Sequence, residues 1–281
     1  MLRAAPPAGP ADPVLPADPV VPGPAAPAAP AAPSATRVTR VAVERPTQFG
    51  APVRVRTSDG LLVARLVGRD GARAEVALVA GGAMLLGGDH VIVSIQVDLG
   101  CTLTLTDVGG TVAYDGDGKE CRWDANIRLG PGAGLAWAGL PFVVADGADV
   151  RRTTTARLGA GARLTLRETV VLGRSGERGG RVVLRTDVAD DVGPILVEEL
   201  TAAGDRPVPG VLGDHAVIDT LTAVHGSPAG PDADQDHPGP APDVGDRPDL
   251  GDAVTLRLER GGTLTRWLGT ATHLSPLGSS S

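Results

Sequence analysis

The sequence predicts an all-β protein, built of stacked sheets or solenoid-like layers of repeated hairpins, with little helix. Apolar and polar residues alternate with a period of two along the middle of the chain. A pattern of strand, glycine-containing turn and strand recurs several times. No window of comparable length has the periodicity of an amphipathic helix.

The alternation is clearest in two segments. WDANIRL (123–129) places tryptophan, alanine, isoleucine and leucine on one face and polar residues on the other, and RVVLRTDV (181–188) alternates likewise. Successive side chains of a strand point to opposite faces, so this pattern predicts half-buried strands.

The internal repeat begins with the dipeptide Leu-Gly. LGPGAGLAW (129–137) and LGAGARLTL (158–166) match closely, LGCTLTL (99–105) is a shorter copy, and 188–197 is a degenerate fourth copy. Glycine supplies the positive φ that tight turns require. One such unit does not bury its apolar face alone, so we expect neighbouring units to stack.

Composition divides the chain into four parts. Residues 1–36 hold eleven of the 25 prolines and are predicted to form a disordered Ala/Pro-rich tail. Residues 37–225 form the main β domain, and 226–251 form a disordered, acidic, Pro/Gly-rich linker. Residues 252–281 contribute a strand pair and tail that belong to the main domain.

The charge and the apolar pattern exclude several classes of protein. A net charge of −7 without a basic patch argues against binding to nucleic acid. No run of 18 apolar residues is present, so we expect no membrane span. The N-terminus lacks the apolar core of a secretory signal, and Cys101 and Cys121 do not make a disulfide framework. We expect a cytoplasmic protein.

The stretch AGGAMLLGGDHV (80–91) has the glycine spacing of a phosphate-binding loop. Gly88 and Asp89 stand where that loop needs lysine and serine or threonine, and an alternating strand follows in place of a helix. We therefore expect the glycines to allow tight turns and a close approach between the segments 73–80 and 91–97. Asp89 would brace the loop through its backbone amides.

The sequence offers no catalytic motif. GRSGE (173–177) lacks the closing glycine of a nucleophile elbow. Asp232, Asp234 and Asp236 have calcium-loop spacing, but His237 occupies the glycine position and prolines exclude the flanking helices. The histidines have no metal-ligand spacing, and a metal site is not identified; they are His90, His215, His225, His237 and His273.

Two carboxylates lie on apolar strand faces. Asp107 continues the face of Cys101, Leu103 and Leu105, and Glu168 lies mid-strand on an inward face. An unpaired inward carboxylate is costly. Glu168 is therefore either paired with arginine or hydrogen-bonded, or turned outward by a bulge. The functional interpretation is that Asp107 and Glu168 line an internal passage for a divalent ion.

The glycine stretch also resembles the Gly-Gly…Gly-Gly-Asp signature of the urease accessory protein D family. Segments further along the chain resemble that family in the same order: LTLTD (103–107), LGPGAGLAW (129–137), 150–179 and PILVEEL (194–200). The residues that match the family pattern are Gly81, Gly82, Gly87, Gly88, Asp89, Thr111, Tyr114, Glu168 and Arg174. The resemblance covers roughly residues 45–225.

The chain departs from the family pattern at polar positions. Val112 replaces the usual lysine, Asp115 stands where arginine is common, and GLPF (139–142) replaces a Pro-Gln-Glu segment. The resemblance therefore identifies a divergent member.

The resemblance implies a non-enzymatic scaffold that binds apo-urease subunits and recruits an adaptor and a GTPase for nickel insertion. It implies no permanently bound cofactor, with nickel in transit. The alternative is a non-catalytic β-rich binding module for an unrelated protein or carbohydrate. A hydrolase would need a catalytic constellation that the sequence does not contain.

Overall fold

The computed structural model describes residues 38–48, 50–207, 210–228 and 252–278. The expected tail (1–36) and nearly all of the expected linker (226–251) lie outside these residues. Strands dominate the described part of the chain, which contains no α-helix, and two short 3₁₀ turns, Thr272–Leu274 and Pro276–Gly278, follow the last strand. The prediction of an all-β fold is confirmed.

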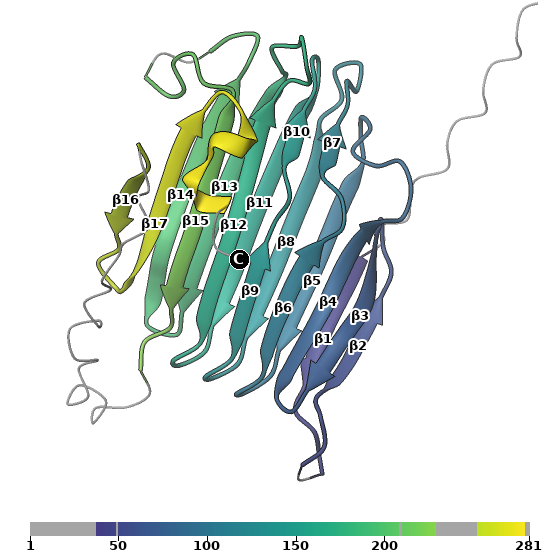
Figure 1. Cartoon of the computed structure of the whole chain (residues 1–281), viewed down its shortest axis with the longest axis vertical. Helices are drawn as coiled ribbons and strands as arrows, with labels where there is room; N and C mark the ends of the chain where they lie inside the picture. Colours follow the sequence, from purple (N-terminus) through teal and green to yellow (C-terminus); the bar gives the residue numbers. More distant parts are fainter. Residues whose placement is uncertain (1–37, 49, 208–209, 229–251, 279–281) are drawn as a thin grey trace, which may run out of the picture. The chain divides into compact units, whose positions relative to one another are not determined.

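The strands form two sheets (Figure 1). In order across sheet A they are β14 (Gly193–Ala203), β13 (Arg181–Asp190), β11 (Asp149–Leu158), β8 (Cys121–Leu129), β5 (His90–Val97), β1 (Val38–Glu44) and β2 (Arg54–Ser58).

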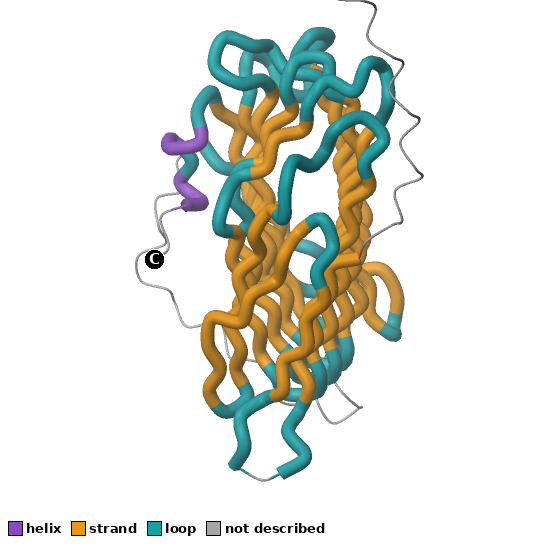
Figure 2. Tube along the Cα trace, turned by 90° about the vertical axis from the view of Figure 1, so that its right-hand side faces the viewer, coloured by secondary structure: helices purple, strands orange, loops and turns teal. Residues whose placement is uncertain are grey.

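Sheet B faces sheet A, and the two layers are visible edge-on in Figure 2. Its order is β16 (Val254–Arg257), β17 (Gly262–Gly269), β15 (Val217–His225), β12 (Arg163–Leu172), β9 (Gly134–Ala138), β6 (Thr102–Asp107), β4 (Arg73–Ala80) and β3 (Leu62–Asp70). A short strand β10 (Phe142–Val144) pairs with both β12 and β7 (Thr111–Ala113).

The chain winds between the sheets as a β-solenoid of about four turns. It passes from β5 to β6, from β8 to β9 and from β11 to β12, each time crossing from sheet A to sheet B. Strands of successive turns pair in parallel and in phase. Leu103, Leu135 and Leu164 consequently lie in one row of sheet B.

The repeating unit is an arch between two sheets, and the expectation of repeated hairpins is wrong in this respect. The glycine turns at 98–101, 130–133 and 159–162 join strands of opposite sheets. A strand, turn and strand pattern is the same for an arch and for a hairpin, so alternation alone does not distinguish them. The degenerate fourth copy does form a hairpin, because β13 and β14 pair antiparallel within sheet A.

The core lies between the sheets and consists mainly of valine, leucine, isoleucine and alanine. Each fully buried aliphatic side chain contributes roughly 1.5–3 kcal/mol relative to an exposed one. Three of the few aromatic residues, Trp123, Trp137 and Phe142, are buried there as well. Trp123 and Phe142 meet edge to face, with their ring centroids 5.9 Å apart.

A cluster of polar contacts, which we call the polar clamp, joins Asp190, Ser227 and Arg260 at the end of the solenoid that carries the glycine turns. Asp190, whose side chain is 3% exposed, accepts hydrogen bonds from the amides of Val192 and Ser227 and forms an ion pair of 2.6 Å with Arg260. Burial acts to raise the pKa of Asp190, but the hydrogen bonds from Ser227 and Arg260 outweigh it and hold the pKa below the usual value. The clamp ties the β13–β14 hairpin to the end of β15 and to the β16–β17 turn.

We expect Asp190→Asn to lower the free energy of unfolding at pH 7 by about 2–3 kcal/mol, because Arg260 loses its counter-charge in a partly buried site. The folded-state pKa lies below the unfolded-state value of about 3.9. The carboxylate therefore stabilises the fold above that value, and this contribution is lost as the pH falls through the folded-state pKa. Urea unfolding across the acidic range measures the effect. If the difference in the free energy of unfolding between the wild type and Asp190→Asn did not become smaller below about pH 4, the stabilising role of the Asp190 carboxylate would be contradicted.

Candidate functional site

Asp107 ends β6 on the inward face, as the sequence predicts. Its Oδ1 accepts a hydrogen bond of 3.1 Å from Trp137 Nε1, and its Oδ2 accepts one of 3.1 Å from the Leu140 amide. Burial raises the pKa of Asp107, and the two hydrogen bonds and the charge of Arg152 oppose that rise. Asp107 is thus a partly desolvated carboxyl group held in a fixed orientation.

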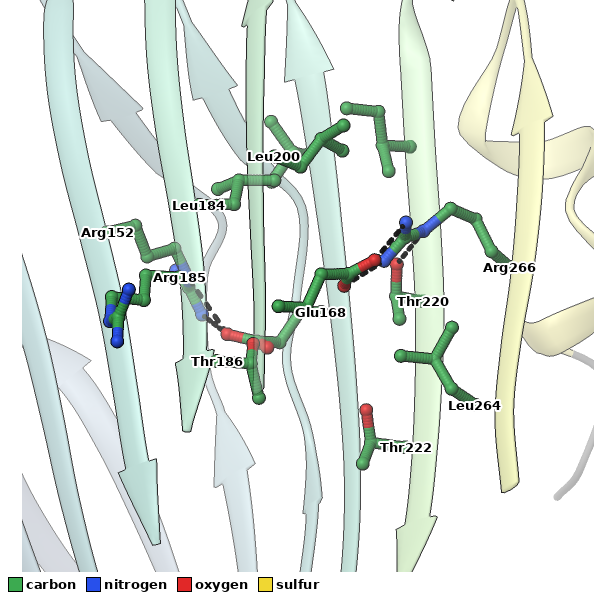
Figure 3. A pocket seen from close by; sticks show the side chains of 13 residues that line it. Arg152, Glu168, Leu184, Arg185, Thr186, Leu200, Thr220, Thr222, Leu264 and Arg266 are labelled. Carbon is green, nitrogen blue, oxygen red and sulfur yellow. Dashed lines mark hydrogen bonds and ion pairs between the residues drawn. The ribbon is translucent and has the colours of Figure 1, made fainter. Parts of the chain in front are cut away.

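Glu168 also points inward, between the buried side chains of Leu166 and Val170 on β12. The pairing of β12 with β15 runs through Glu168 without a register shift, which excludes the alternative of a bulge at this position. Glu168 Oε1 accepts a hydrogen bond of 3.0 Å from Arg152 Nε (Figure 3). It accepts another of 3.0 Å from Thr154 Oγ1. The arginine-paired alternative is therefore the observed one.

Arg152 is the ionic partner of Glu168. It lies on β11 in sheet A, its side chain is 10% exposed, and Nη2 lies 3.0 Å from Glu168 Oε1. Its guanidinium carbon is 5.1 Å from the ring centroids of both Trp123 and Phe142, within the range of a cation–π contact. The indole nitrogen of Trp123 has no hydrogen-bond partner among the described residues.

A second ion pair lies across the interior from the first (Figure 3). Arg266 on β17 forms a bidentate contact with Glu198 on β14, with distances of 2.8 and 2.6 Å. Arg266 Nε also donates to Thr220 Oγ1 at 3.1 Å. These pairs join sheet A to sheet B, and we call Asp107, Arg152, Glu168, Glu198 and Arg266 the polar layer.

Three residues of the polar layer were not predicted from the sequence: Arg152, Glu198 and Arg266. The signal that would have found the two arginines is the same alternation that identified Glu168. Arg152 interrupts an inward face between Val150 and Thr154, and Arg266 lies between two leucines. Which acid each arginine meets depends on how the sheets face each other.

A small cavity separates the two ion pairs. Its volume is about 30 Å³, enough for roughly two water molecules. The residues that line it include the arginines and glutamates of both pairs, Arg185, and the hydroxyl-bearing residues Thr186, Thr220 and Thr222. Among the described residues, no group of three or more His, Cys, Asp or Glu side chains is placed to hold a metal ion. Each glutamate of the cavity instead has an arginine as its partner.

The glycine motif lies elsewhere, in the loops at the end of the solenoid opposite the arches. A Cβ atom on Gly87 would come within 2.5 Å of the Cα atom of Gly116 in the loop that precedes β8. The expected close approach is thus between two loops. The expectation that it joins 73–80 and 91–97 is wrong, because these strands, β4 and β5, lie in opposite sheets. Asp89 Oδ2 accepts a hydrogen bond from the Leu86 amide at 3.0 Å, as expected for a brace.

The remaining family-pattern residues surround the same loops. The Thr111 amide donates to Pro141 O at 3.0 Å, and the Tyr114 amide donates to Leu85 O at 3.0 Å. The Arg174 guanidinium lies 5.9 Å from the Tyr114 ring centroid. Gly81 and Gly82 lie between β4 and these contacts, and Gly88 has a φ of +88°. The structure therefore separates the loop motif from the polar layer.

Arg174 also pairs with Glu177 in its own loop. The side-chain hydrogen bond from Arg174 is the largest influence that lowers the pKa of Glu177, to about 2. Both groups are at the surface, so the pair fixes the local loop conformation and contributes little to overall stability.

Comparison with known proteins gives a consistent result. The model of the UreD urease accessory protein family matches residues 33–274. Urease accessory protein UreD 1 of Streptomyces griseus is 43% identical over 193 residues, which cover 68% of this chain and 76% of that protein. Urease accessory protein UreD of Streptomyces coelicolor is 34% identical over 180 residues, covering 62% and 71%. The protein of the same name from Frankia alni is 39% identical over 170 residues, covering 53% and 57%.

The loop packing at Gly87 is tested by two substitutions within one motif. Gly87→Ala places a methyl group against the Gly116 backbone, whereas a Cβ atom on Gly82 meets nothing within 4 Å. We expect Gly87→Ala to cost about 1–3 kcal/mol of stability and Gly82→Ala less than about 0.5 kcal/mol. Thermal and urea unfolding of both variants measure the difference. Equal stability of the two variants would contradict the loop contact.

Proposed function

The chain belongs to the UreD urease accessory protein family, and from that premise we propose that it is a scaffold of urease maturation. In this role it binds nickel-free urease and recruits further accessory proteins, an adaptor and a GTPase, for nickel insertion. The observation that carries the proposal is the family match, which spans the whole solenoid from β1 to β17. The family name describes an accessory protein, in agreement with the expectation of a non-enzymatic role.

The architecture supports a binding role. The two sheets are continuous backbone ladders from one end of the solenoid to the other. The sheets fix the positions of the outer faces, the sheet edges and the loops relative to one another. A scaffold that binds several partners needs such fixed surfaces. No helix in the described residues is long and apolar enough to cross a membrane. The proposal places the protein in the cytoplasm.

The family match also favours the urease role over the alternative of a module for an unrelated protein or carbohydrate. Affinity purification of the tagged chain from cells that express urease, grown with and without nickel, tests the proposal. We expect nickel-free urease subunits to be recovered from the cells without nickel, and less urease from cells with nickel. Failure to recover urease or any accessory partner under both conditions would favour the alternative.

We further propose that nickel is a cargo that passes between the two sheets and meets Glu168. Three features support this: Glu168 borders a small cavity between the sheets, Asp107 lies on the inward face of the same sheet, and the positive charge of Arg152 acts on both carboxylates. Carboxylate oxygen is an acceptable ligand for nickel, though a less selective one than imidazole or thiolate. A weak ligand suits an ion that must leave again. No nickel is held permanently in this scheme.

Glu168→Gln tests the passage, because it keeps the shape of the side chain and removes its charge. We expect urease activation in nickel-supplied cells to fall at least about tenfold, a barrier increase of about 1.4 kcal/mol, while urease is still recovered with the variant. Glu199→Gln is the matched control, since Glu199 lies on β14 in the other sheet, has a 51% exposed side chain and does not line the cavity. Unchanged activation and unchanged stability of Glu168→Gln would overturn the passage at this residue.

A further inference from the structure

The position of Arg152 has a consequence for any cation that approaches Glu168. The guanidinium of Arg152 donates to Glu168 Oε1 through Nε at 3.0 Å, and Nη2 lies at 3.0 Å from the same oxygen. Thr154 Oγ1 occupies a further site on that oxygen. A divalent cation that approaches Oε1 therefore meets a fixed positive charge at hydrogen-bond distance, in an interior that screens charge poorly.

Arg152 also contacts two aromatic rings. Its guanidinium carbon is equally far, 5.1 Å, from the ring centroids of Trp123 and Phe142. Its charge reaches Asp107 as well as Glu168. The two rings therefore offer the guanidinium contacts that do not depend on its pair with Glu168.

The opposite wall of the cavity repeats the arrangement. Glu198 is held in a bidentate contact by Arg266, and Arg266 is fixed to Thr220. Thr220 is the direct cross-strand neighbour of Glu168 in sheet B. Both glutamates that border the cavity are thus neutralised by an arginine in the conformation described.

We propose that Arg152 is a gate, which excludes divalent cations from the space between the sheets while it is paired with Glu168 and admits nickel when it turns away. The gate rests on the proposed function, because it supposes that nickel is the cargo. While the pair is formed, the Glu168 carboxylate is closed to divalent cations.

The test is titration of the purified full chain with Ni²⁺ alone, followed by calorimetry and by thermal unfolding. Arg152→Gln removes the positive charge and leaves Glu168 a buried carboxylate without an ionic partner. We expect the variant to bind Ni²⁺ at one site at least about tenfold more tightly than the wild type. Ni²⁺ should raise the Tm of the variant more than it raises the Tm of the wild type.

Two control variants separate the gate from background binding. Arg152→Gln combined with Glu168→Gln should lose the gained affinity, because the carboxylate is no longer present. Arg185→Gln removes another arginine of the same cavity wall, whose acidic neighbours are Asp187 and Glu199. It should bind Ni²⁺ as the wild type does. Equal Ni²⁺ affinity of Arg152→Gln and the wild type, or an equal gain in Arg185→Gln, would overturn the gate.

A second comparison keeps the test decisive if Arg152→Gln does not fold. The wild type and Glu168→Gln should then bind Ni²⁺ equally weakly, since Arg152 already keeps the ion from Glu168. A wild-type site that disappears in Glu168→Gln would show that Arg152 does not exclude the metal and would overturn the gate.

Recovery of urease with the same proteins distinguishes the two proposals. Wild-type chain that recovers urease, together with no gain of Ni²⁺ affinity in Arg152→Gln, overturns the gate and leaves the scaffold role standing. If Arg152→Gln gains tenfold in Ni²⁺ affinity but the wild-type chain recovers no urease, the exclusion of cations by Arg152 is supported and the urease role is overturned.

Discussion

The structure depends on the in-phase stacking of successive solenoid turns. In the middle of both sheets a strand of one turn pairs in parallel register with the same strand of the next turn, so inward side chains form continuous rows from turn to turn. The apolar rows make the core. The charged residues of the polar layer do not follow these rows: Arg152 is in register with Trp123 and Leu184, and it meets Glu168 across the two sheets.

Each glutamate of the polar layer is paired with an arginine. Glu168 and Glu198 come from different sheets, and each is neutralised by an arginine of the opposite sheet. Replacing buried ion pairs by well-packed apolar residues of similar volume is often neutral or stabilising in other proteins. Stability alone therefore does not account for the ion pairs between the two sheets. The loops at the opposite end are held differently from the polar layer. Their contacts are the close backbone packing of Gly87 against Gly116 and ion pairs at the surface such as Arg174–Glu177.

Much of this arrangement could be predicted from the sequence. Alternation placed Asp107 and Glu168 on inward faces, and the recurring glycine turns indicated stacked units. Alternation did not distinguish arches from hairpins, because both show a strand, a turn and a strand. The arginine partners were also missed, since Arg152 and Glu168 lie on opposite sheets and meet only because an arch folds β12 under β11. The separation of β4 from β5 has the same origin, because the loop between them crosses from one sheet to the other.

The claim that nickel travels between the sheets is tested most directly by anomalous diffraction at the nickel edge. Crystals of the chain in complex with nickel-free urease, supplied with Ni²⁺, would give the position of the metal independently of activity. The result expected is an anomalous peak between the sheets within coordination distance of the Glu168 carboxylate, with Arg152 turned away from it. Nickel bound only at surface side chains such as His90, with the Arg152–Glu168 pair intact, would contradict an interior path.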